Sequence, residues 1–77
     1  MLSRSVACHL AEGVIAKGLG EIQGRFPDLD IGSYPFYRRG EFGTSLVQRG
    51  RDSDRLAAGT VEVAALVRSL GGDPVEE

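Results

Sequence analysis

Residues 31–49 read IGSYPFYRRGEFGTSLVQR, and this stretch decides the fold of the chain. Ile31–Tyr37 reads as one strand, and Phe42–Arg49, whose side chains alternate between two faces, reads as the next. Arg38–Glu41 lies between them as a turn, in which Gly40 can take a positive φ. The stretch therefore predicts an antiparallel β-hairpin with a short connection.

The first strand of this hairpin contains residues that strands seldom carry. Pro35 cannot donate a hydrogen bond to a ladder, so it predicts an edge strand or a bulge. Gly32, close to Tyr34 and Pro35, is costly in a strand unless something packs closely against its backbone. We therefore expect a specific backbone shape or contact at this point.

A helix is predicted after the hairpin, and its pattern is the clearest in the chain. Apolar or small side chains recur at steps of three and four residues, which is typical of one helix face. The stripe consists of Leu56, Thr60, Val63, Val67 and Leu70. Asp52 or Ser53 is suited to cap the start. Gly71–Gly72 is suited to end the helix, and Pro74 stops any continuation.

A second helix is predicted before the hairpin, over Ala11–Phe26. Its apolar positions also suit one helix face; they are Val14, Ile15, Leu19, Ile22 and Phe26. Four glycines lie among them, and each costs roughly 1 kcal/mol relative to alanine inside a helix. We therefore expect packing, more than propensity, to hold this helix.

A first and a last strand complete the pattern. Ser5–Leu10 alternates, with Val6, Cys8 and Leu10 toward the core, and Pro74–Glu76 can add a short last strand. The order is β-α-β-β-α-β, and right-handed crossovers interleave such units into one sheet. The predicted fold is α+β and ferredoxin-like, a four-stranded antiparallel sheet with two helices on one face.

Composition limits the classes of function. The chain has 77 residues and a formal net charge of −2, which suits one small core and argues against a dedicated nucleic-acid binder. No apolar run approaches the roughly 20 residues that span a bilayer, and no segment suits a signal peptide. We therefore expect one cytoplasmic domain over residues 1–77, with no membrane partner.

Residues with catalytic or metal-binding chemistry are few. Cys8 and His9 are neighbours on a predicted strand, so they point to opposite faces and do not form a nucleophile–base pair. A lone cysteine and a lone histidine make a poor metal set. Cys8 is expected to be a buried thiol, and His9 is expected to be an exposed residue of the sheet. We therefore expect no catalytic site, no metal and no cofactor.

The arginines are the most unusual polar feature. Arg38 and Arg39 lie at the hairpin turn, whereas Arg49 and Arg51 lie at its other end, roughly 20–25 Å away at 3.3 Å per residue. They are therefore expected to be solvated turn residues, or else to dock a domain or bind an anionic ligand.

An RNA-recognition motif shares the βαββαβ order, and residues 39–44 come close to its third-strand signature. The first predicted strand, however, offers no stacking aromatic at Val6–His9. A nucleic-acid-binding module with an RRM-like or KH-like sheet is therefore kept as the alternative.

Four strings carry a family resemblance: Phe26–Asp28, Ile31–Phe36, Gly40–Val47 and Leu70–Gly72. Together they resemble the C-terminal portion of CinA-like (competence/damage-inducible) proteins, which are also described as molybdopterin-binding-domain proteins. A similar Gly-Ser-Tyr-Pro stretch follows the same domain in eukaryotic FAD synthase. The family's N-terminal domain is linked in several members to hydrolysis of pyrophosphate-containing nucleotides, and its Gly-Gly-x-Gly-Pro-Thr-type loop is absent here. The resemblance thus implies the auxiliary domain that follows.

The leading hypothesis is a non-catalytic accessory domain, excised from a larger CinA-like protein. The resemblance implies that this parent protein is a nucleotide pyrophosphatase. The domain's expected partner is the adjacent molybdopterin-binding-like domain, with a homo-oligomer left open. Eight hairpin residues are the expected interface: Gly32, Ser33, Tyr34, Pro35, Phe36, Arg38, Arg39 and Phe42. A further alternative is that the arginines complete a nucleotide site in the neighbouring domain.

Overall fold

The hairpin forms as predicted, with both strands slightly longer than expected. In the computed structural model, which describes residues 1–77, β2 spans Asp30–Arg38 and β3 spans Glu41–Gly50. The two strands pair antiparallel over this whole length without a bulge. Pro35 is therefore accommodated by an edge position, because β2 is the outermost strand of the sheet.

The hairpin turn consists of two residues with unusual backbone angles. Arg39 and Gly40 have φ values of 51° and 80°, and two successive residues with positive φ make a turn whose twist suits paired strands. The positive φ predicted for Gly40 is confirmed. Arg39 adopts one as well, although its side chain makes that conformation less favourable than it is for glycine.

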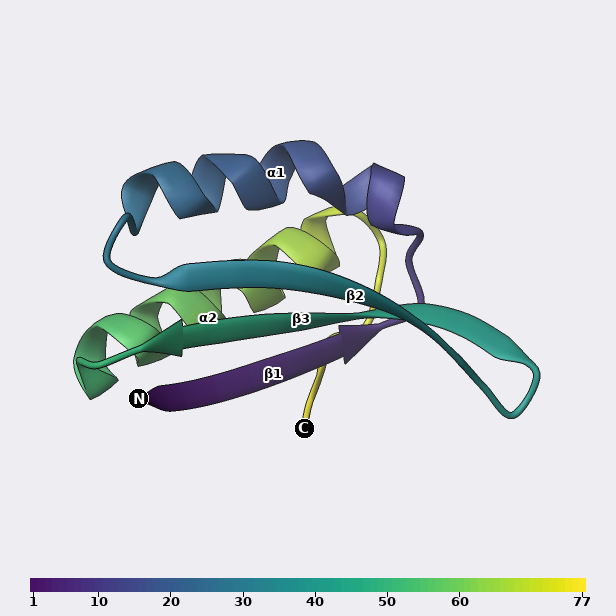
Figure 1. The fold of residues 1–77 in the computed structure, drawn as a ribbon. Helices are drawn as coiled ribbons and strands as arrows, with labels where there is room; N and C mark the ends of the chain where they lie inside the picture. Colours follow the sequence, from purple (N-terminus) through teal and green to yellow (C-terminus); the bar gives the residue numbers. More distant parts are fainter.

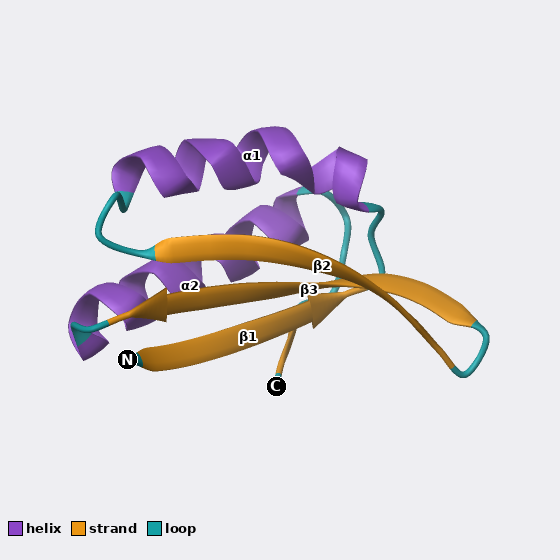
Figure 2. Ribbon diagram, viewed as in Figure 1, coloured by secondary structure: helices purple, strands orange, loops and turns teal.

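The two remaining strands complete one sheet. β1 (Leu2–Cys8) pairs antiparallel with β3, and β4 (Val75–Glu76) pairs antiparallel with β1. The strand order is β2-β3-β1-β4, and both helices cover the same face of the sheet (Figure 1). The predicted four-stranded, ferredoxin-like α+β fold is confirmed, and the other face of the sheet carries no helix (Figure 2).

The first strand lies earlier in the sequence than alternation alone predicted. It begins at Leu2 and not at Ser5, because Leu2 pairs with Gly50 at the far end of β3. It ends at Cys8. Leu10 comes after the strand, where it is half-buried against the core.

The helix α1 (Glu12–Arg25) uses one face for the core and one glycine for contact with α2 (Ser53–Ser69). Ile15 is fully buried, whereas its neighbour Val14 is 53% exposed. Val14 was expected in the buried stripe; adjacent helical residues point about 100° apart, so only one of the two can face the sheet. A Cβ on Gly18 would lie 2.4 Å from Leu66 Cδ1 of α2, so this glycine lets the helices approach closely.

The helix α2 is capped at both ends by the predicted residues. The Asp52 carboxylate accepts hydrogen bonds from the backbone N–H groups of Asp54 (2.9 Å) and Arg55 (3.2 Å). At the other end Gly71 has a φ of 87°. Its N–H and that of Gly72 donate back to carbonyls of the last turn, which is the Schellman arrangement.

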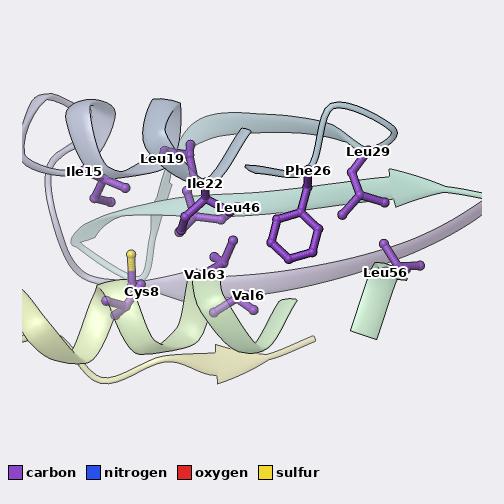
Figure 3. Packing of buried hydrophobic residues seen from close by; sticks show 11 residues of the cluster. Val6, Cys8, Ile15, Leu19, Ile22, Phe26, Leu29, Leu46, Leu56 and Val63 are labelled. Carbon is purple, nitrogen blue, oxygen red and sulfur yellow. The ribbon is translucent and has the colours of Figure 1, made fainter. Parts of the chain in front are cut away.

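The core lies between the helices and the covered face of the sheet (Figure 3). Leu46, at the centre of β3, is fully buried. The cluster comprises Val6, Cys8, Ile15, Leu19, Ile22, Phe26, Leu29, Leu46, Leu56, Val63 and Val67. This single core fixes which face of the sheet is left for other contacts.

Candidate functional site

The structure separates the predicted interface residues onto two faces of the sheet. Side chains alternate along β2, so Tyr34 and Phe36 lie on the face without helices, which we call the open face. Pro35, opposite Thr44, and Phe42 lie on the helix side. These four residues therefore do not form one patch.

Tyr34 lies in a row of small side chains that crosses the open face. The register places it opposite Ser45, then Ala7, then Val75. Tyr34 is 51% exposed and Val75 57% exposed. The tyrosine ring leans over Gly32, where a Cβ would lie 3.1 Å from its hydroxyl oxygen. The glycine thus allows the close contact that the sequence predicted, and the row forms a low surface on which one half-exposed ring lies.

Phe36 is covered by its own chain. Its ring lies over Gly43, where a Cβ would be 2.4 Å from Phe36 Cζ and 2.6 Å from the carbonyl oxygen of Cys8. The Arg38 guanidinium lies 4.4 Å from the ring centroid, a cation–π contact. The His9 ring meets it edge to face at 6.2 Å. Phe36 therefore serves to order this end of the open face.

The predicted arginines have different surroundings. Arg38 donates to the Glu77 carboxylate (3.2 Å), which also accepts from Ser45 Oγ (2.9 Å). Arg39, at the turn, has no ion pair within 4.0 Å. A shallow hollow of about 380 Å³ lies beside them. Its lining comprises Ala7, Cys8, His9, Phe36, Arg38, Arg39, Glu41, Val75 and Glu77.

The edge of β2 is protected against pairing with another strand. The Ile31 N–H donates sideways to Gln23 Oε1 at 3.0 Å, and Ser33 and Pro35 face the same way because backbone directions alternate. Proline supplies no donor there. Two backbone positions on the outer edge, Ile31 and Pro35, therefore have no free N–H to offer another strand. This is a common protection against edge-to-edge association. Ser33 itself is half-buried on the helix side, opposite Leu46.

Tyr37 is an aromatic residue that sequence reasoning missed. It lies opposite Phe42, and the two ring centroids are 4.7 Å apart. They are 62% and 78% exposed, and the turn end of the hairpin, to which they belong, projects past the start of α1 (Figure 1). The signal was present in the turn: with Arg39 and Gly40 as the turn residues, Tyr37 must face Phe42 across the hairpin.

Cys8 and His9 lie on opposite faces, as predicted. Cys8 is 1% exposed, and its thiol donates to the Thr44 carbonyl at 3.6 Å. His9 is exposed, with Nδ1 3.0 Å from the carbonyl oxygen of Phe42 and Nε2 3.5 Å from a Glu41 carboxylate oxygen. Both groups thus tie the end of β1 to residues 41–44 of β3.

An ion pair that sequence reasoning missed ties α2 to the loop before β2. Arg55 donates to both carboxylate oxygens of Asp28, at 3.0 and 2.8 Å, and its guanidinium lies 4.4 Å from the Phe26 ring centroid. The hydrogen bond from Arg55 holds the pKa of Asp28 below its usual value. The same bond raises the pKa of Arg55. The bidentate geometry identifies this pair as a structural brace.

A narrow cleft between α2 and the strands β1 and β4 contains polar groups. The Arg4–Glu76 ion pair holds the short β4 against β1 at its mouth. Deeper in the core, fully buried Gln48 accepts a hydrogen bond from Thr60 Oγ1 at 3.2 Å, and its amide nitrogen has no partner. Turning the amide over lets that nitrogen donate to the same hydroxyl but leaves the amide oxygen without a partner, so in either orientation one polar atom of buried Gln48 is unpaired.

Both helices stay below the combination of length and apolar character that a membrane crossing requires.

Comparison with known proteins supports the fold and shows the family. The de novo designed protein Foldit4 has a TM-score of 0.78 at 11% identity, covering 97% of this chain and 91% of that one. A de novo designed protein with a ferredoxin fold has a TM-score of 0.68 at 11% identity, covering 100% and 84%. A C-terminal segment of the α subunit of aIF2 from Pyrococcus abyssi has 0.54 at 10% identity, covering 97% and 48%.

These likenesses are of fold alone, since the identities are low. No curated relative matches the chain. Residues 1–71, nearly the whole chain, match the family described as the FAD synthase middle domain. The matched residues span the hairpin and both helices of this chain. The chain therefore belongs to the family of FAD synthase middle domains.

Proposed function

We propose that this chain is a non-catalytic accessory domain that docks against a molybdopterin-binding-like domain of the same protein. The observation that carries the proposal is the family match, because the family is described as a middle domain, one part of a longer enzyme. The CinA-like parent and its nucleotide pyrophosphatase activity are part of the proposal, and they rest on the residues quoted for that resemblance.

The docking surface in this proposal is the open face. Its central row, Tyr34, Ser45, Ala7 and Val75, is low and partly apolar, and a single half-exposed ring lies on it. A half-exposed tyrosine surrounded by small side chains is the kind of group that dominates binding when it fills a partner's pocket. Helices already occupy the opposite face of the sheet.

The residues with chemical reactivity have structural tasks, which supports a non-catalytic role. The Cys8 thiol is buried against a carbonyl, and the Asp28 carboxylate is held by Arg55. The nucleic-acid alternative is not better supported. Tyr34 and Phe36, the phenyl-type rings on the open face, both belong to the edge strand β2, whereas the central strands present Ala7 and Ser45. An RRM stacks bases on aromatics of its conserved strand motifs.

The experiment uses the matched tyrosines of β2. Tyr34 and Tyr37 are three residues apart, similarly exposed and on opposite faces. The domain encoded beside this chain is expressed separately, and its affinity for the chain is measured by calorimetry. Tyr34→Glu should weaken binding at least tenfold, a loss of about 1.4 kcal/mol, while Tyr37→Glu should leave it unchanged. Equal effects of both variants, or no binding by the wild type, would refute the proposal.

A salt titration separates the alternative function. Binding of single-stranded RNA that weakens steeply with added salt would favour a nucleic-acid module, because phosphate contacts release counterions. We expect no such binding at low salt, where electrostatic affinity is greatest.

A further inference from the structure

The hairpin arm, residues 35–44, carries an aromatic pair that its own chain does not cover. The ring centroids of Tyr37 and Phe42 lie 4.7 Å apart, with the ring planes tilted by 59°, and the two residues are 62% and 78% exposed. They lie on the helix side of the sheet, yet the arm projects past the start of α1 (Figure 1). Phe36, the third aromatic residue of the arm, is half-buried because Arg38 and His9 pack against its ring. The exposed pair is therefore the part of the arm left free for a contact.

A hollow lies directly beside this pair, at the root of the arm. It has a volume of about 240 Å³. Its lining comprises His9, Leu10, Ala11, Glu12, Pro35, Phe42, Gly43 and Thr44. Phe42 thus belongs both to the protruding pair and to the wall of the hollow. A surface that carries an exposed ring beside a hollow can pair with the same surface of a second copy about a two-fold axis.

The charges at the two ends of this surface have opposite signs. Arg39 lies at the tip, beyond the aromatic pair, and Glu12 lies at the rim of the hollow, in the first turn of α1. Neither has an oppositely charged partner within 4.0 Å. An apolar surface with a cation at one end and a carboxylate at the other matches a second copy that runs in the opposite direction.

We propose that two copies of this chain associate through the helix side of the hairpin arm. The two arms lie antiparallel about a two-fold axis near Phe42, so that the ring pairs stack on each other. Arg39 of each copy then reaches Glu12 of the other, which makes two symmetric ion pairs. The proposal uses the side of the hairpin that faces away from the open face, so it stands or falls separately from the docking function proposed above.

The size of the surface sets the expected strength. An aromatic side chain buries about 150–250 Å², so the exposed parts of four rings supply roughly 500–600 Å² of apolar area. With the rim residues the interface lies at or below the low end of specific complexes, about 1,200 Å². We therefore expect a reversible dimer with a Kd in the micromolar range or weaker.

The test is sedimentation equilibrium of the 77-residue chain over about 10 μM to 1 mM, the range that such a weak interface requires. Phe42→Ser should raise the Kd at least tenfold, and Tyr34→Ser, on the open face, should leave it within about twofold. All these side chains are exposed, and a melting curve for each variant confirms that the fold is retained.

A charge exchange makes the test specific. Arg39→Asp and Glu12→Lys should each weaken the dimer, and the double variant should restore most of the affinity, because its charges again match. Aspartate is chosen because it tolerates positive φ, which position 39 requires. A chain that stays monomeric up to 1 mM, a dimer equally weakened by Tyr34→Ser, or a double variant without recovery would each overturn the proposal.

Discussion

Replacing Gly43 with alanine tests how the open face is built. A Cβ at this position would lie 2.4 Å from Phe36 Cζ and 2.6 Å from the carbonyl oxygen of Cys8. The ring can swing away, but it then loses its contacts with Arg38 and His9. The carbonyl belongs to β1, which is paired with β3 at this point, so it cannot move without disturbing the ladder.

The magnitude follows from two opposing effects. Forcing a methyl group into a filled site costs about 1–3 kcal/mol. Replacing a strand glycine recovers roughly 0.5–1 kcal/mol, since the unfolded chain loses freedom. The difference of these ranges is about 0–2.5 kcal/mol, and the backbone obstacle at 2.6 Å favours its upper part. We therefore expect Gly43→Ala to lower the free energy of unfolding by about 1–2 kcal/mol, a decrease in Tm of about 4–16 °C for a domain of this size.

The assay is thermal and urea unfolding, with Gly20→Ala as the matched control. Gly20 lies within α1, and a Cβ there meets nothing within 4 Å, so the same chemical change should stabilise the chain by about 1 kcal/mol. In a Phe36→Ala background, Gly43→Ala should cost less, because one of its two obstacles is gone. A Gly43→Ala variant as stable as the wild type would refute this account of the open face.

The remaining predictions concern the core and two polar contacts. Leu46→Ala, at a fully buried position in a central strand, should cost about 2–5 kcal/mol in urea unfolding. Gln23→Ala should cost about 1–3 kcal/mol in the same assay, because it leaves the Ile31 N–H and two loop carbonyls without their partner. Arg55 lowers the pKa of Asp28 from 3.8, so the pair stabilises the fold above pH 3.8 and this contribution is lost as the pH falls through the lower folded value. In an NMR titration the Asp28 carboxyl should therefore titrate below 3.8 in the wild type and closer to it in Arg55→Gln; identical titrations would refute the assignment.

The element order and the helix caps follow from local chemistry, so the sequence alone predicts them. Alternation in residues 42–49 places Leu46 inward, and the positions of Asp52 and Gly71 mark the ends of α2. The start of β1 could not be placed this way. It depends on pairing between Leu2 and Gly50, which are distant in sequence.

The candidate site was predictable only in part, because exposure depends on where the helices end. Alternation puts Phe42 on the same face as Leu46, yet one is 78% exposed and the other fully buried. The difference arises because the arm extends beyond α1 (Figure 1). The pattern of residues within a strand does not indicate how far the covering helix reaches along it. The division of Tyr34 and Pro35 between two faces does follow from alternation once the strand is accepted.

The central claim is that the open face, and not the projecting arm, meets the neighbouring domain. NMR mapping of the isotope-labelled chain, titrated with the unlabelled domain encoded beside it, tests this most directly. We expect the amide signals of Gly32, Tyr34 and Ala7 to shift on binding, while those of α1 stay in place. Shifts centred on Tyr37 and Phe42, or along α1, would contradict it.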